Sequence, residues 1–121
     1  MTKTIKVTEE FSDRLTNRNQ LQGDGKKNAE DFRKKYLSFL DSPDEWVKTA
    51  IEENSPAIIF DFSEVKKIGP SFANEAFAYF TKYEGATPKA IMLRISFINI
   101  SIVQKEIIEI ELESGYSGYS K

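Results

Sequence analysis

The sequence predicts a single α/β domain in which helices pack against a small mixed β-sheet. Two apolar runs and the helical pattern between them lead to this expectation. Residues 57–62 (Ala-Ile-Ile-Phe-Asp-Phe) are nearly all apolar, as expected for a central strand. Residues 71–84 then place apolar side chains at helical spacing, and residues 90–97 form a second strand-like run. Residues 57–97 therefore predict a βαβ unit whose two strands are parallel.

The composition is that of an ordinary globular chain and excludes several kinds of active site. Of 121 residues 40% are hydrophobic, and 17 Lys and Arg stand against 19 Asp and Glu, so no basic nucleic-acid footprint is present. The chain has neither cysteine nor histidine, which excludes thiolate catalysis, Ser-His-Asp triads and the commonest metal ligands. We therefore expect no catalytic residue, no metal and no cofactor. No apolar run approaches the length of a membrane span, and we expect a cytoplasmic protein without membrane contact.

The N-terminal third predicts a strand and a helix. Residues 3–8 alternate polar and apolar side chains, which indicates a strand with one buried face. Residues 11–21 fit either an irregular second strand or a long loop. Residues 23–25 (Gly-Asp-Gly) predict a turn, and the spacing of apolar residues after it predicts a helix over 26–40.

The remaining elements follow from capping signals and periodicity. Residues 42–45 (Ser-Pro-Asp-Glu) are typical of a capping box with proline at the first helical position, so we expect a helix that stops at 54–56. Gly85 stands where the helix over 71–84 should end. Residues 100–112 favour a helix, although 107–113 also alternate like a strand, and both readings stay open there.

The loop over 63–70 and the serine that follows it form the best candidate site. The loop leaves the carboxyl end of the strand at 57–62, the edge where α/β sheets usually receive ligands and partners. Ser71 then opens a helix. Its hydroxyl would either cap the helix by accepting from the N–H of Ala73 or Asn74, or serve as a phosphorylation acceptor that adds about −1.5 to −2 charge.

This segment resembles a known family. The chain is similar to the bacterial STAS-like family of unknown function, in which a Gly-containing turn, a helix with Phe-Arg, a strand and Ser-Phe-x-x-Glu-Ala-Phe follow one another. Here these are Gly23 to Gly25, Phe32-Arg33, Ile58 to Phe62 and residues 71–77, a match over about residues 4–84. More distantly, the distance from Asp61 to Ser71 resembles that of STAS domains of anti-sigma-factor antagonists, in which the serine that opens this helix is phosphorylated.

The resemblance implies a STAS-like domain over residues 1–113, and the repeated Gly-Tyr-Ser triplet over 115–120 predicts a mobile tail over 114–121. It implies a regulatory, non-enzymatic protein-binding module, with a serine switch and a histidine-kinase-like ATPase as the partner. Gly69 and Pro70 depart from the antagonist pattern, which usually has an acidic and a small polar residue before the acceptor. The oligomeric state is left open.

Several residues of the loop and of the helix start are candidates for partner binding. These candidates are Ser63, Lys66, Lys67, Gly69, Pro70, Ser71, Asn74 and Glu75. Glu75 would bind a basic group of the partner, or else stabilise its own helix start, and Asp61 would hold the loop by accepting backbone N–H groups. The alternatives to a switch are a structural or scaffold subunit and, further away, a small enzyme that uses carboxylates.

Overall fold

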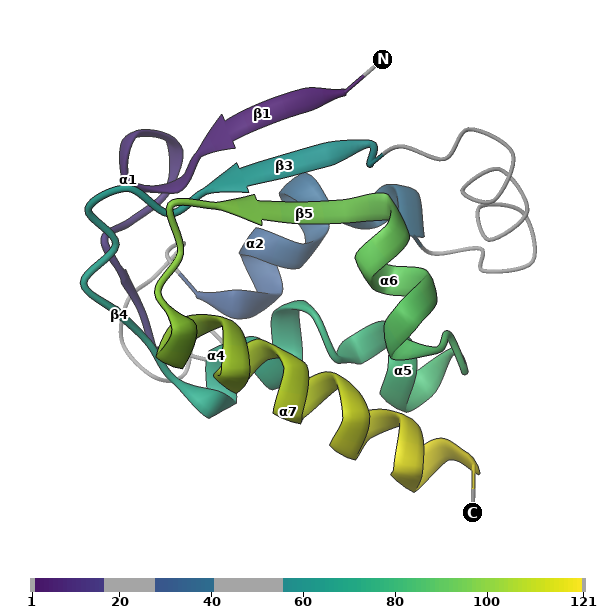
Figure 1. The fold of residues 1–121 in the computed structure, drawn as a ribbon. Helices are drawn as coiled ribbons and strands as arrows, with labels where there is room; N and C mark the ends of the chain where they lie inside the picture. The colour runs from purple at the N-terminus through teal and green to yellow at the C-terminus, as the bar shows by residue number, and fades with distance from the viewer. Residues whose placement is uncertain (1, 17–27, 41–55, 121) are drawn as a thin grey trace.

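The protein is described by a computed structural model, and the account below covers residues 2–16, 28–40 and 56–120. Twelve elements occur in these ranges, with short loops between most of them (Figure 1). The strands are β1 (Lys3–Lys6), β2 (Arg14–Leu15), β3 (Ile58–Asp61), β4 (Lys67–Ile68) and β5 (Ile95–Ile98). The helices are α1 (Val7–Glu10), α2 (Ala29–Tyr36), the 3-10 turn η2 (Ser38–Leu40), α4 (Pro70–Ala76), α5 (Tyr79–Tyr83), α6 (Pro88–Arg94) and α7 (Ile102–Ser120).

The sheets confirm the α/β class and place β3 at the centre. The main sheet has the order β1-β3-β5, and the second pairs β2 with β4. Ile5 pairs with Phe60, which pairs in turn with Phe97 on the other side. We expect a mixed sheet, but all pairings of the described strands are parallel. The parallel β3 and β5 confirm the unit expected over 57–97.

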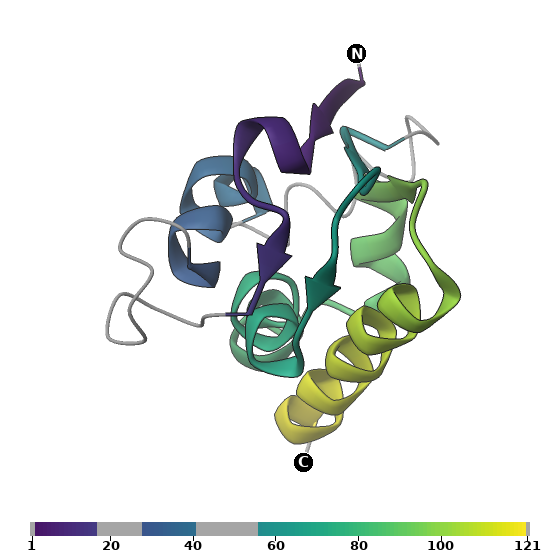
Figure 2. The ribbon, with the colours of Figure 1, turned by 90° about the vertical axis from the view of Figure 1, so that its left-hand side faces the viewer.

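The core lies between the main sheet and the helices beneath it. Figures 1 and 2 show α2, α4, α5, α6 and α7 on one side of the sheet. Phenylalanine rings fill this space: Phe32 of α2 lies 5.3 Å from Phe60 and 5.4 Å from Phe72, measured between ring centroids. The rings of Phe32 and Phe72 meet edge to face and those of Phe32 and Phe60 are tilted, and aromatic pairs of this kind add to the hydrophobic stabilisation of burial. The sheet is therefore fixed to α2 and α4 through aromatic side chains.

The first half of the chain follows the predicted pattern with shorter elements. The strand expected over 3–8 ends at Lys6, and α1 replaces its last residues. The segment over 11–21, which fitted either an irregular strand or a long loop, contains the short strand β2. Within the predicted helix, α2 begins after Asn28, whose side chain accepts from the N–H of Asp31. The predicted turn at 23–25 and the helix after 42 lie outside the described residues.

The second half corrects three predictions. The single helix expected over 71–84 is divided into α4 and α5, and Gly85, with φ of +76°, ends α5 as expected. Residues 90–94, expected to be strand, belong to α6, and the strand begins only at Ile95. Residues 107–113 are helical, and residues 114–120, expected to be a mobile tail, continue α7.

The turn of α7 that carries Gly115 packs closely against α5. A Cβ atom at this position would lie 2.6 Å from Oγ1 of Thr81 and 3.2 Å from the carbonyl oxygen of Ala78. Only glycine allows this approach without displacing a neighbour. The tight packing against α5 explains why the helix extends through a segment rich in glycine and serine.

Candidate functional site

The carboxyl end of β3 is organised by the side chain of Asp61. One carboxylate oxygen, Oδ1, accepts from the N–H of Ser63 at 2.9 Å, from its hydroxyl at 2.6 Å and from the Asn99 amide at 3.0 Å. Asp61 therefore holds the loop that leaves β3 and also the connection from β5 to α7, which confirms the predicted loop-holding role.

These hydrogen bonds favour the ionised form of the Asp61 carboxyl group. The side-chain and backbone hydrogen bonds from Ser63, together with that from Asn99, lower the pKa of Asp61 from 3.8 to about 2. Lys6 adds a smaller favourable charge interaction. Asp61 is consequently a charged structural acceptor at neutral pH.

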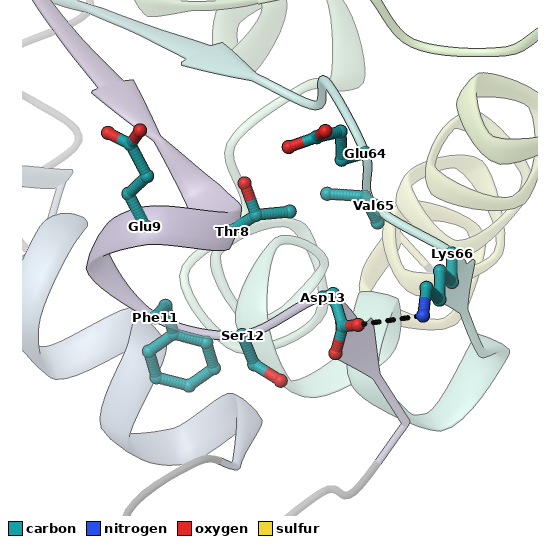
Figure 3. Close-up of a pocket in the computed structure, with 8 residues that line it drawn as sticks. All are labelled: Thr8, Glu9, Phe11, Ser12, Asp13, Glu64, Val65 and Lys66. Atoms are coloured by element: carbon teal, nitrogen blue, oxygen red, sulfur yellow. Dashed lines mark ion pairs between the residues drawn. The ribbon is translucent and has the colours of Figure 1, made fainter.

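A groove of about 740 Å³ lies beside this loop, between residues 8–13 and residues 64–66 (Figure 3). It is lined by Thr8, Glu9, Phe11, Ser12, Asp13, Glu64, Val65 and Lys66. In Figure 3 the carboxylates of Glu9 and Glu64 lie on either side of Thr8, and the pair between Lys66 Nζ and Asp13 Oδ2, 3.5 Å apart, lies at one end. The groove thus offers hydroxyl and carboxylate oxygens beside the apolar side chains of Phe11 and Val65.

The loop wall of the groove is fixed by backbone bonds. The N–H of Lys66 donates to the Asp13 carbonyl at 2.8 Å, and that of Gly69 to the Leu15 carbonyl at 2.8 Å. These bonds lie at both ends of the β2–β4 pairing. Glu64 has a φ of +65°, a conformation that is uncommon for residues other than glycine. The loop therefore has a defined shape that presents the Glu64 side chain to solvent.

The start of α4 differs from the prediction by one residue. Gly69, not Ser71, is the N-cap residue, Pro70 occupies the first helical position, and no side chain caps the helix. Ser71 is the second helical residue and is exposed. The predicted capping bond from Ser71 to Ala73 or Asn74 is therefore wrong, because the preceding glycine and proline move the helix start upstream.

Asn74 and Glu75 make contacts within the protein. The Asn74 amide donates to Oε1 of Glu111 at 3.1 Å, and Lys82 Nζ donates to its oxygen at 3.2 Å. These bonds connect α4 with α7 and α5. Asn74 is thus engaged in holding helices together.

Glu75 is paired with the guanidinium of Arg33 on α2. Arg33 donates from Nη2 to Oε2 of Glu75 at 3.0 Å and from Nε to its carbonyl at 3.2 Å. The side chains are only 11% and 18% exposed, and the Arg33 guanidinium also lies 3.7 Å from the centroid of the Tyr79 ring. Of the two roles considered for Glu75, the geometry supports an internal structural one.

The candidate residues therefore separate into two groups. Ser63 and Lys66 lie in the loop beside the groove, while Lys67, Pro70 and Ser71 are exposed on β4 and the start of α4. Gly69, Asn74 and Glu75 serve the internal structure. The sequence-based prediction missed the groove wall formed by residues 8–13. The signal that could have found it is the end of the first strand, which lies beside the end of β3 when the two pair in parallel.

Neither a metal-binding cluster nor a membrane-spanning helix occurs in the described part of the chain. Residues 2–16, 28–40 and 56–120 contain no group of three or more Asp and Glu side chains placed to hold a metal ion. None of the helices described there is long and apolar enough to cross a membrane.

Comparison with known proteins finds a family that part of the chain matches. Residues 47–105 match the model of a family described as a STAS-like domain of unknown function (DUF4325). The match covers a little under half of the chain and includes β3, the loop, α4 to α6 and β5. No curated protein and no solved structure matches the chain. The resemblance to the STAS-like family of unknown function is thereby confirmed over residues 47–105, a segment that contains the loop after β3 and Ser71.

Proposed function

We propose that this protein is a non-enzymatic regulatory module that docks a protein partner at the groove and at the start of α4, with Ser71 as a phosphorylation switch. The match to a STAS-like family supports a protein-interaction role in general terms. The location of the docking surface and the switch is our own inference from the geometry of this edge.

The exposed and uncapped start of α4 is the observation that carries the proposal. Ser71 lies in the first helical turn, and no side chain caps that turn. A phosphoryl group on Ser71 would meet N–H groups and the positive end of the helix dipole, both of which stabilise an anion. The hydroxyl is accessible and is not used as a cap, so its modification would change the surface without breaking a capping bond.

The groove and Ser71 are near enough to act on one partner. Ser71 lies five positions after Lys66 at the groove, and five steps along the chain span at most about 17 Å. A partner that fills the groove would therefore also lie near Ser71. Addition of a dianion there would alter the electrostatic fit, and such changes act strongly on association rate and specificity.

The proposed kinase is a histidine-kinase-like ATPase. This part of the proposal is supported by the resemblance of the Asp61-to-Ser71 distance to that of antagonist domains, and Gly69 and Pro70 remain a departure from their pattern. The decisive experiment incubates the protein and its Ser71→Ala variant with ATP and a kinase of this class that is encoded by a neighbouring gene. Phosphoryl mass shift at Ser71, absent in the variant, is the expected result.

Binding of the partner is tested with Ser71→Asp and Ser71→Ala. If Ser71 is a switch, these two variants differ from each other in partner affinity, whereas the same substitutions at exposed Ser38 on η2 have no effect. Equal affinity of both Ser71 variants would reject the switch and leave a non-switching scaffold subunit. Charge reversal at the groove by Lys66→Glu separately tests the docking surface.

A further inference from the structure

Helix α7 carries apolar side chains on two opposite sides. Ile108 and Leu112 are fully buried on the side that packs against α4 and α5. On the other side Ile102, Val103 and Ile110 are 79%, 65% and 61% exposed. An exposed row of large aliphatic side chains on a helix marks an interaction surface.

Acidic residues accompany this exposed row. Glu106 lies between Ile102 and Ile110 on the helix surface, since residues four apart are neighbours. Glu109 and Glu113 line a depression of about 240 Å³ between α7 and α6. No ion pair or hydrogen bond joins any of these three carboxylates to another residue in the described ranges, although Lys89 borders the same depression.

We propose that the outward face of α7, defined by Ile102, Val103, Glu106, Ile110 and the depression beside Glu109 and Glu113, docks a basic amphipathic helix of another protein. This surface shares no residue with the groove or with Ser71, and the proposal does not depend on the function proposed above. The aliphatic row would bury the apolar side of the partner helix. Lysine or arginine side chains beside that row would meet the three carboxylates.

The charges distinguish this partner from a second copy of the chain. A two-fold dimer places the same surface patch of each copy opposite the other. Two α7 faces would then bring six carboxylates together at one interface, and like charges brought together across an interface cost several kcal/mol. A basic partner turns the same carboxylates into attractive contacts. Charge complementarity therefore selects a cationic helix as the occupant.

The probe is a synthetic amphipathic helix made of leucine and lysine. The outward row from Ile102 to Glu113 is about 18 Å long, so a peptide of about 14 residues covers it. Two control peptides are a scrambled sequence of the same composition and a leucine/glutamate peptide of the same pattern. Methyl and amide NMR spectra of the whole chain should change at Ile102, Val103 and Ile110 with the leucine/lysine peptide and with neither control.

Matched variants separate this surface from general electrostatic attraction. Ile110→Ser should weaken peptide affinity about tenfold, and Ile102→Ser should act in the same direction. Ile98→Ser, at a 42% exposed isoleucine on β5, should leave affinity unchanged. Glu106→Gln should reduce both the affinity and its salt dependence, whereas Glu64→Gln, which removes the same charge at the groove, should not.

Four results would overturn the proposal. They are equal binding of the scrambled peptide, an equal loss of affinity with Glu64→Gln, spectral changes outside the α7 face, and a concentration-dependent dimer that is abolished by Ile110→Ser. Circular dichroism and melting temperature of each variant confirm that folding is unchanged, as expected for substitutions at exposed positions.

Discussion

The helices α4 and α7 both begin after a strand of the parallel sheets, but their first turns are held in opposite ways. At α7 the side chains of Ser101 and Gln104 bond reciprocally to each other's backbone N–H, both at 3.1 Å. Gln104 also donates to the Val65 carbonyl at 3.1 Å. At α4 there is no side-chain cap. A serine at the start of a helix is thus a structural cap in α7 and an exposed hydroxyl without a capping bond in α4.

Buried packing should hold α4 in place of a cap, and removing it should have the largest effect. Phe72 is fully buried in the aromatic core, so Phe72→Ala should lower the free energy of unfolding by about 3–5 kcal/mol. Urea denaturation measures the loss. Phe39→Ala, at a ring that is 37% exposed, is the matched control and should have a much smaller effect. Similar losses in both variants would contradict the role assigned to Phe72.

The pair between Arg33 and Glu75 is the second support of α4. Glu75→Gln leaves a guanidinium that is only 11% exposed without its carboxylate. We expect a loss of about 2 kcal/mol in the free energy of unfolding. The control is Glu30→Gln, which breaks the exposed pair with Lys34 and should change stability by less than about 0.5 kcal/mol. A loss at position 75 no larger than that at position 30 would show that the pair does not anchor α4.

The two serines should respond differently to the same substitution. Ser101→Ala removes the capping bond of α7 and should cost about 1 kcal/mol. Ser71→Ala removes no such bond and should stay within about 0.5 kcal/mol. Thermal and urea unfolding of the two variants give the comparison directly. If Ser71→Ala were as destabilising as Ser101→Ala, the hydroxyl of Ser71 would be a cap in solution.

Acid should weaken the hydrogen bonds by which Asp61 holds the loop after β3 and the connection from β5 to α7. We expect this loss of stability to be the smallest of the four, because the carboxyl group is near solvent. Its pKa in the folded protein is lowered to about 2 from 3.8. A lowered pKa contributes stability that is complete above pH 3.8 and is lost as the pH falls toward 2. Melting temperatures of the native chain and of Asp61→Asn should therefore converge over this range. A constant difference between them would contradict the assignment.

The sequence predicts best those elements that local pattern decides. The apolar run at 57–62 and the alternation at 3–8 identify β3 and β1, and parallel pairing of β3 with β5 follows from the helical segment between them. The prediction of a strand at residues 90–94 was wrong, because a short apolar run fits a buried strand and a buried helix equally. The missed signal is Thr87-Pro88: Thr87 caps α6 by accepting from Ala90 at 3.1 Å.

The other errors come from interactions that no local pattern contains. Gly115 disfavours a helix by propensity, and only the close approach to Thr81 explains why α7 continues there. At the site, the loop-holding role of Asp61 was predictable because short acidic side chains often accept nearby N–H groups. The groove was not, since its two walls are brought together by the pairing of Leu15 with Ile68.

One oxygen of Asp61 accepts hydrogen bonds from both Ser63 and Asn99, so it joins two segments that are far apart in the sequence. Asn99 has a φ of +55° and is held in this unfavourable conformation partly by its bond to Asp61. A partner that draws Ser63 away would remove two of the three hydrogen bonds on the oxygen that also restrains Asn99. The loop after β3 and the connection from β5 to α7 therefore share one acceptor atom, and a displacement of the loop would be felt first at Asn99.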